Sequence, residues 1–136
     1  MKRIIALLLI ISIFTACGDS SLDELNFLPL EELPEDYTWE QAAEDGVYVN
    51  IHGIEEWNRK AFDSFSSNVK AGKPAFVRVM RYTAEGDPVL SDVIFNGEIF
   101  TVIEDFSRDK WGSGDIETTV YTPEEWEEVR QYILPK

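Results

Sequence analysis

The 136-residue chain has one cysteine and one histidine. With Cys17 alone it can form no internal disulfide, and a domain that follows Cys17 has no thiol nucleophile. A single histidine, His52, excludes a multi-histidine metal site, and a Ser-His-Asp triad could use only this residue. A G-x-S-x-G elbow, a P-loop and a dinucleotide fingerprint are also missing from the sequence. These absences remove the enzyme classes that short motifs identify most readily.

Basic residues are scarce as well. The chain carries 12 lysines and arginines against 26 aspartates and glutamates, a formal net charge of −14. Nucleic acids and anionic lipid headgroups are bound by basic patches, so we expect no nucleic acid among the partners. Basic proteins, cationic peptides and divalent cations are partners that the negative charge would attract. The simplest interpretation of this charge is an acidic surface exposed to solvent.

The N-terminus has the pattern of a secretion signal. Lys2 and Arg3 precede an apolar run at residues 4–16. Thirteen residues of helix are too short for the roughly 30 Å core of a bilayer, which favours a cleaved signal over a spanning anchor. The run ends in Phe14-Thr15-Ala16-Cys17-Gly18, which resembles the lipobox of bacterial lipoproteins, with Phe14 where leucine is commonest.

This resemblance implies a signal peptide over residues 1–16 and a lipid, such as palmitate, on Cys17. Cleavage would leave 120 residues with 10 basic and 26 acidic side chains, a net charge of −16. Two acyl chains hold a protein on a membrane far better than one. We therefore expect lipid anchoring to the cell membrane on the extracytoplasmic side. The alternatives are a plain secretory peptide with an incidental cysteine, or a single transmembrane anchor.

Residues 17–37 are predicted to form an acidic tether, and residues 38–136 a single domain. Large apolar side chains are unusual in a linker: Leu22, Leu25, Phe27, Leu28, Leu30 and Leu33. Two interpretations follow, and we favour the first. These side chains pack back on the domain, or they form a short segment that binds a partner.

Capping boxes and hydrophobic periods predict the elements of the domain. Two helices begin with a capping box, at Thr38-Trp39-Glu40-Gln41 and at Thr122-Pro123-Glu124-Glu125. Apolar residues at spacings of three and four predict a helix over residues 54–71, with Phe62 and Phe65 at the centre of the core. The predicted strands cover residues 47–51, 75–82, 89–95, 98–106 and 116–121. Asn96-Gly97 predicts a two-residue type I′ hairpin turn.

The element order β-α-β-β-β-β-α predicts an α+β fold, with an antiparallel sheet of about four to five strands and helices packed on one face. A helix followed by a meander is also similar to the element order of cystatin-like folds, an analogy that carries little weight for function. Trp39, Trp57 and Trp126 fit helix faces and are expected in the core.

Several segments together resemble a known family. They are Val49-Asn50-Ile51-His52-Gly53, Asn68-Val69, Arg81-Tyr82-Thr83-Ala84-Glu85-Gly86-Asp87-Pro88, Asn96-Gly97 and Ser107-Arg108-Asp109-Lys110-Trp111-Gly112. They resemble a domain of unknown function, DUF4362, over about residues 46–114. The resemblance implies a small lipoprotein of Gram-positive bacteria with a shared fold, and it carries no established activity.

Two loops of this region are the candidate binding surface. We call it the two-loop surface, and its residues are Arg81, Tyr82, Glu85, Asp87, Arg108, Asp109 and Trp111. A tryptophan in a glycine-rich loop is either an exposed interface anchor or a side chain folded over the end of the sheet. Three arginines among acids, Arg78, Arg81 and Arg108, predict ion pairs across the strands, with a carboxylate or phosphate site as the alternative.

Acidic residues suggest two further hypotheses. Glu85, Asp87, Asp92, Glu104 and Asp105 could serve a small hydrolase, although a glycosidase needs two carboxyls that face each other across a cleft. Asp105, Asp109 and Asp115 are weak candidates for a metal site, because Trp111 occupies a ligand position of the calcium-loop pattern. A catalytic role for His52 is not favoured, and we expect no cofactor.

The function predicted from the sequence is a membrane-anchored lipoprotein whose domain is a non-enzymatic binding or accessory module. A protein or peptide at the cell surface is its expected partner. The alternatives are an inhibitor-like module that acts on an extracellular enzyme, and a small hydrolase.

Overall fold

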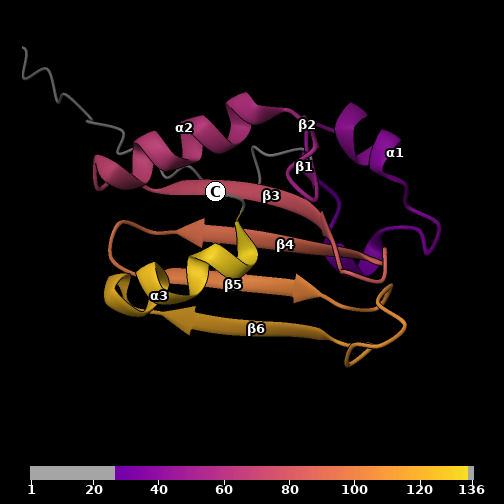
Figure 1. Ribbon diagram of the computed structural model, residues 1–136. Helices are drawn as coiled ribbons and strands as arrows, with labels where there is room; N and C mark the ends of the chain where they lie inside the picture. The colour runs from indigo at the N-terminus through magenta and orange to yellow at the C-terminus, as the bar shows by residue number, and fades with distance from the viewer. Residues whose placement is uncertain (1–26, 135–136) are drawn as a thin grey trace, which may run out of the picture.

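Six strands form one open sheet in the order β2-β1-β3-β4-β5-β6 (Figure 1). The computed structural model describes residues 27–134. The strands are β1 (Tyr48–Ile51), β2 (Glu55–Trp57), β3 (Ala75–Tyr82), β4 (Pro88–Phe95), β5 (Phe100–Asp105) and β6 (Ile116–Tyr121). β1 and β3 run parallel, and every other neighbouring pair is antiparallel.

Three α-helices accompany the sheet: α1 (Trp39–Glu44), α2 (Arg59–Lys70) and α3 (Pro123–Ile133). Both predicted capping boxes are confirmed, since Thr38 and Thr122 each accept a hydrogen bond from the backbone N–H three residues on. Pro123 occupies the first turn of α3, where its missing N–H costs nothing. In the part of the chain that the structure describes, no helix is long and apolar enough to cross a membrane.

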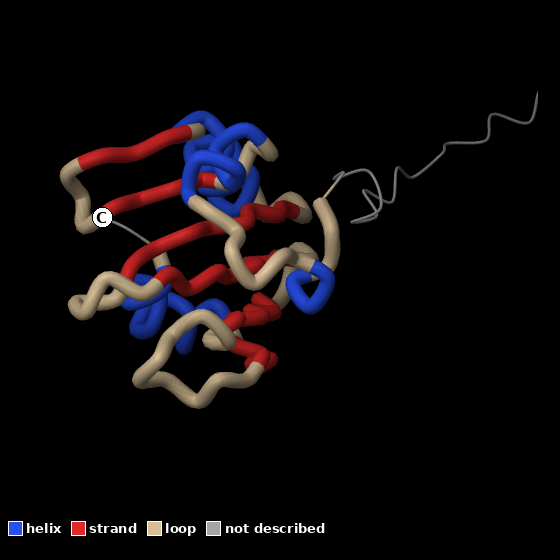
Figure 2. Tube along the Cα trace, turned by 90° about the vertical axis from the view of Figure 1, so that its right-hand side faces the viewer, coloured by secondary structure: helices blue, strands red, loops and turns tan. Residues whose placement is uncertain are grey.

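The main core lies between the sheet and the helices α2 and α3, which cover the same face (Figures 1 and 2). Phe62 and Phe65 on α2 and Trp126 on α3 are buried there, as predicted. Aromatic rings stack across this core, with Phe100 4.6 Å from Trp126 and Tyr48 5.2 Å from Phe62 between ring centroids. Alternate residues of β3 and β4 point toward these helices, and among them Val77, Val79 and Val93 form the sheet side of the core.

A second core lies on the opposite face of the sheet. α1 and the segment that precedes it cover Val49, Met80 and Leu90 there. We call residues 27–37 the N-terminal strap; it contains a short 3₁₀ turn, η2 (Leu30–Glu32), which lies on the far side of the sheet from α3 in Figure 2. These residues belong to the predicted tether, and in the structure they are packed on the sheet.

The apolar residues of the strap divide into buried and exposed ones. Leu30 is 3% exposed and Leu33 9%, so the expectation that they pack back on the domain is confirmed for both. Leu28 is 54% exposed. Leu22 and Leu25 lie outside the described residues, as do the predicted signal peptide and Cys17.

The predicted helix at residues 54–71 is wrong at its start. α2 begins at Arg59, and residues 55–57 form the short strand β2 instead. His52 and Asn58 both have positive φ, 52° and 58°, so the chain turns sharply on each side of β2. Asn58 Nδ2 donates to the carbonyls of Ala43 and Val47, both at 2.8 Å. These hydrogen bonds offset the energetic cost of the left-handed backbone conformation at Asn58. Trp57 therefore lies on a strand, and the centroid of its ring is 4.3 Å from that of the Trp39 ring.

The hairpin at Asn96-Gly97 exists, but its turn differs from the predicted type I′. Phe95 pairs with Phe100, which leaves a four-residue loop, 96–99. Gly97 has a φ of 102°, whereas Asn96 is not among the residues with positive φ. The Asn96 side chain accepts hydrogen bonds from the N–H groups of Glu98 and Ile99, both at 2.9 Å. This local capping stabilises the longer loop.

The α+β prediction is confirmed, with an open sheet and helices that pack against it. The sheet has six strands, not four or five, and one pair is parallel. The sixth strand is β2, which is short and carries two glutamates, so it has no hydrophobic period to reveal it. The helices lie on both faces and not on one, because α1 and the N-terminal strap cover the face opposite to α2 and α3. The composition of the strap is that of a linker, so its part in this cover has no clear signal in the sequence.

Candidate functional site

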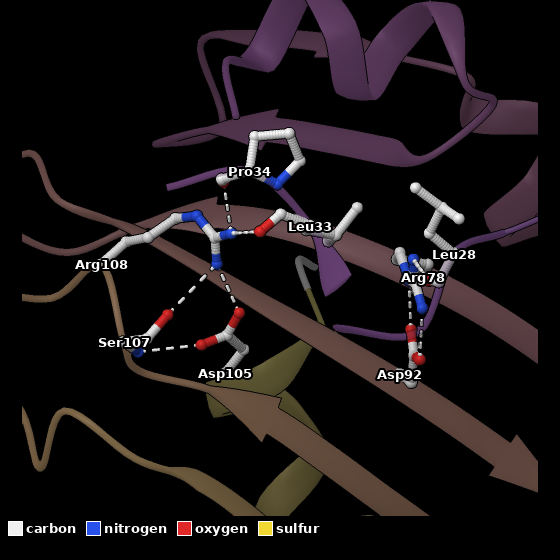
Figure 3. Close-up of polar contacts among 8 residues, drawn as sticks. All are labelled: Leu28, Leu33, Pro34, Arg78, Asp92, Asp105, Ser107 and Arg108. Carbon is white, nitrogen blue, oxygen red and sulfur yellow. Dashed lines mark hydrogen bonds and ion pairs between the residues drawn. The ribbon is translucent and has the colours of Figure 1, made fainter. Parts of the chain in front are cut away.

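Arg78 lies at the centre of the strap-covered face and is almost fully buried, with a side chain 3% exposed. Its Nε and Nη2 donate to the two carboxylate oxygens of Asp92, at 2.6 and 2.7 Å. The register places these two residues directly opposite on β3 and β4. Nη1 donates to the backbone carbonyl of Leu28 at 2.7 Å (Figure 3). The centroid of the Phe27 ring lies 5.0 Å from the guanidinium carbon. Arg78 therefore joins the sheet to the N-terminal strap.

Arg108 makes a second connection to the strap. Its Nη2 donates to the carbonyls of Leu33 (3.1 Å) and Pro34 (2.6 Å), and its Nη1 donates to the Asp105 carboxylate (Figure 3). The side chain is 8% exposed and that of Asp105 1%. Asp105 also accepts from the backbone N–H of Ser107 at 2.9 Å. Arg108 was expected on the two-loop surface, and the structure places it beneath the strap instead.

The predicted ion pairs across the strands are confirmed for Arg78 and Arg81, whereas Arg108 pairs locally with Asp105, three residues before it in the chain. Arg81, on the α2/α3 face, donates from Nη2 to Glu104 at 2.7 Å, across β4. Ser91, which lies between them on β4, donates to the same carboxylate oxygen at 3.3 Å. All three guanidinium groups thus have a carboxylate partner within the domain. The structure favours the structural role over the alternative of a carboxylate or phosphate site.

The two loops of the two-loop surface are in contact, as their place at one end of the sheet suggested. The backbone N–H of Lys110 donates to the Asp87 carboxylate at 3.2 Å, and the Lys110 ammonium lies 3.7 Å from the same group. The position of Asp87 is fixed within its own turn, because its backbone N–H donates to the Thr83 hydroxyl at 3.2 Å. The β3–β4 turn therefore fixes the position of the β5–β6 loop.

Trp111 projects from this loop with 80% of its surface exposed. Its backbone N–H donates to Asp109 Oδ1 at 3.0 Å, which closes a tight turn just before the exposed ring. A Cβ added at Gly112 would lie 2.8 Å from Asp109 Oδ2, so a larger residue there would displace the Asp109 side chain. Of the two interpretations given for this tryptophan, the structure supports an exposed side chain and not a ring folded over the sheet.

The remaining residues of the two-loop surface are dispersed. Arg81 and Tyr82 are neighbours on a strand and point to opposite faces of the sheet. Burial raises the pKa of the Tyr82 hydroxyl, and the charge of Glu40 on α1 adds to this effect. Glu85 is exposed in the β3–β4 turn. The part of the two-loop surface that stays together consists of Asp87, Asp109 and Trp111, and Lys110, which was not among the predicted residues, joins them.

The weak candidates for a metal site do not form a cluster. Among residues 27–134, no group of three or more histidine, cysteine or acidic side chains is arranged to hold a metal ion. Asp105 is held by Arg108, and Asp109 by the turn at Trp111. At the end of the loop, the Asp115 carbonyl accepts from the Phe106 N–H, and the Asp115 N–H donates to the Ser113 hydroxyl.

Four of the five acids of the hydrolase hypothesis are also engaged, and the fifth, Glu85, is exposed in the β3–β4 turn. Asp92, Glu104 and Asp105 each bind an arginine, and Asp87 binds the backbone of Lys110. Carboxylates in such pairs are not free to face each other across a substrate. His52 is exposed at the β1–β2 turn and borders a small hollow of about 140 Å³, which Asn50, Arg81 and the end of α3 also line.

A larger hollow, which the sequence did not predict, lies between α2 and α3. It has a volume of about 740 Å³ and an apolar floor of Phe62, Phe65 and Trp126, with Lys70 and Arg130 among the polar residues at its rim. Arg130 is already paired with Glu127 at 2.9 Å. The apolar spacing of the two helices predicted these side chains in the core. The hollow depends on the distance between α2 and α3, which the sequence of neither helix reveals.

Replacing Arg78 by methionine is predicted to lower the free energy of unfolding by about 3–5 kcal/mol, because it leaves the Asp92 carboxylate buried without a cation. The double variant Arg78→Met/Asp92→Leu should recover most of this loss, since it removes both charges. Urea denaturation of each variant measures the effect.

The control is Arg130→Met, which breaks an ion pair whose side chains are 53% and 64% exposed. Exposed pairs contribute little, so its cost should stay below about 1 kcal/mol. A loss for Arg78→Met no larger than that of the control would refute the role given to Arg78.

Comparison with known proteins identifies a family. No curated protein and no solved structure matches the chain. The model of a domain of unknown function, DUF4362, matches residues 44–131, which include all six strands, α2 and most of α3. The match begins after the N-terminal strap and contains Arg78 and Arg108, which hold that strap. Since it covers more than half of the sequence, the chain belongs to the DUF4362 family.

Proposed function

We propose that this protein is a lipid-anchored lipoprotein on the extracytoplasmic side of the cell membrane of a Gram-positive bacterium, and that its domain is a non-enzymatic binding module. The lipobox-like sequence that ends at Cys17 supports the anchor. Packing of the strap from residue 27 leaves residues 18–26 as the link between Cys17 and the domain. Nine residues reach at most about 30 Å, the length of a fully extended chain, so the domain would stay close to the membrane.

The observation that carries the binding role is the exposure of Trp111 on a loop with a fixed base. A tryptophan offers a large contact area at a small cost in conformational entropy, and such residues dominate interface energies. Bonds to Asp87 and Asp109 hold the backbone on which it stands. The chain is acidic overall, Glu85 and Asp115 are exposed in the same two loops, and the neighbouring Lys110 is paired with Asp87. We therefore expect a partner protein or peptide with a basic surface.

The anchor is tested by growth with a palmitate analogue that can be labelled. The unchanged chain should take up the label and fractionate with membranes, whereas Cys17→Ser should lose the label. Thr15→Ser, which keeps a small residue before Cys17, is the matched control and should stay labelled. An unchanged chain that is released without label, or cut at another position, would contradict the proposed anchor.

The binding role is tested by crosslinking in cells followed by mass spectrometry. Trp111→Ala should lose a captured partner, and its free energy of unfolding should change by less than about 0.5 kcal/mol because the ring is exposed. Ile99→Ala is the control, since Ile99 is 38% exposed in the β4–β5 hairpin, at the opposite end of the sheet from the two loops, and should retain the partner.

Two results would count against the binding role of Trp111: a large loss of stability in Trp111→Ala, or equal capture by Trp111→Ala and the unchanged chain. A captured protease that loses its activity in the complex would identify the inhibitor-like form of the same binding role.

A further inference from the structure

The two outer strands of the sheet differ in how their open edges are protected. β2 has three residues, of which two are glutamates. β6 has six residues, Ile116–Tyr121, with Glu117 as its one charged side chain and neither lysine nor proline. Short strands, charges and prolines are the usual means of keeping a sheet edge from pairing. β2 is therefore a blocked edge, and β6 is an open one.

Side chains on β6 are exposed on both faces of the sheet, from Ile116 to Val120. Ile116 is 39% exposed and Val120 56%. With Thr118 between them, these two residues lie on the face opposite to α2 and α3. The strap and α1 cover Val49, Met80 and Leu90 on that face, on the β1, β3 and β4 side of the sheet.

We propose that β6 pairs antiparallel with β6 of a second copy of this chain, around a two-fold axis at Thr118. In this register Ile116 of each copy lies opposite Val120 of the other, on the same face, and Thr118 lies opposite its own equivalent. The pairing covers the two exposed apolar side chains of the strand. Apolar and Thr–Thr pairs of this kind stabilise antiparallel strands, and an interface that relates one patch to itself closes as a dimer.

The charges of β6 fit this register. Glu117 of each copy lies opposite Thr119 of the other, so no two glutamates face each other across the new pair. Each chain carries a net charge of −14, which opposes association at low salt. Salt screens such repulsion over about 8 Å at physiological ionic strength, so the dimer should become stronger as sodium chloride is added. A contact made by ion pairs would respond in the opposite way.

The test places a thiol on the proposed axis. The full chain with Thr118→Cys, in whole cultures of the producing cells without fractionation, is treated with a short bismaleimide. Crosslinked dimer should form, should increase with salt, and should be lost when Val120→Lys is added. Val120→Lys lowers the net negative charge, so this loss cannot come from added repulsion between the copies.

Two controls separate the proposed contact from chance collisions. The unchanged chain, whose one cysteine is Cys17, measures crosslinking through that residue. Ile54→Cys places a thiol at an equally accessible site, 83% exposed, in the turn beside β2. A dimer yield for Thr118→Cys no higher than in these controls would overturn the proposal. A crosslink from residue 118 to a different protein would also overturn it, and would show that another chain adds its strand to β6.

Discussion

Burial of two arginine side chains is the constraint on which the arrangement of this domain depends. A guanidinium group inside a protein needs a carboxylate and further acceptors for its remaining N–H groups. Arg78 and Arg108 find their carboxylates on the sheet, in Asp92 and Asp105, and their further acceptors in the backbone of the N-terminal strap. The strap therefore supplies hydrogen-bond acceptors to both guanidinium groups as well as apolar cover for the sheet, while the Nε of Arg108 is buried without an acceptor among the described residues.

Ion pairing by arginine also determines the charge of the surface. Each of the five arginines in residues 27–134 forms an ion pair with a carboxylate of the domain: Arg59, Arg78, Arg81, Arg108 and Arg130. These cations neutralise acids within the domain, so the many remaining acids determine the charge that a partner meets. The Trp111 ring and the β6 edge are among the apolar features exposed on this acidic surface, and they serve the two proposed contacts.

Local signals in the sequence predicted most of the fold. Capping residues set the starts of α1 and α3, and alternation set β3, β4 and β6, because these signals act within a few residues. The ion pairs were predicted because arginines are rare here and lie beside acids on neighbouring strands. The strap was harder to predict, since its prolines and acids are typical of a linker and its acceptors are backbone carbonyls that carry no side-chain signature. The depth of Arg108 was missed for the same reason.

Leu30 and Leu28 provide the most direct test that the strap is part of the folded domain. They are the same residue type two positions apart, one 3% and the other 54% exposed. Replacing Leu30 by alanine should reduce the free energy of unfolding by about 2–5 kcal/mol, whereas Leu28→Ala, which keeps the carbonyl bound by Arg78, should change it by less than about 0.5 kcal/mol. Equal and negligible effects of the two substitutions in urea denaturation would show that residues 27–37 are a tether, and would contradict this account.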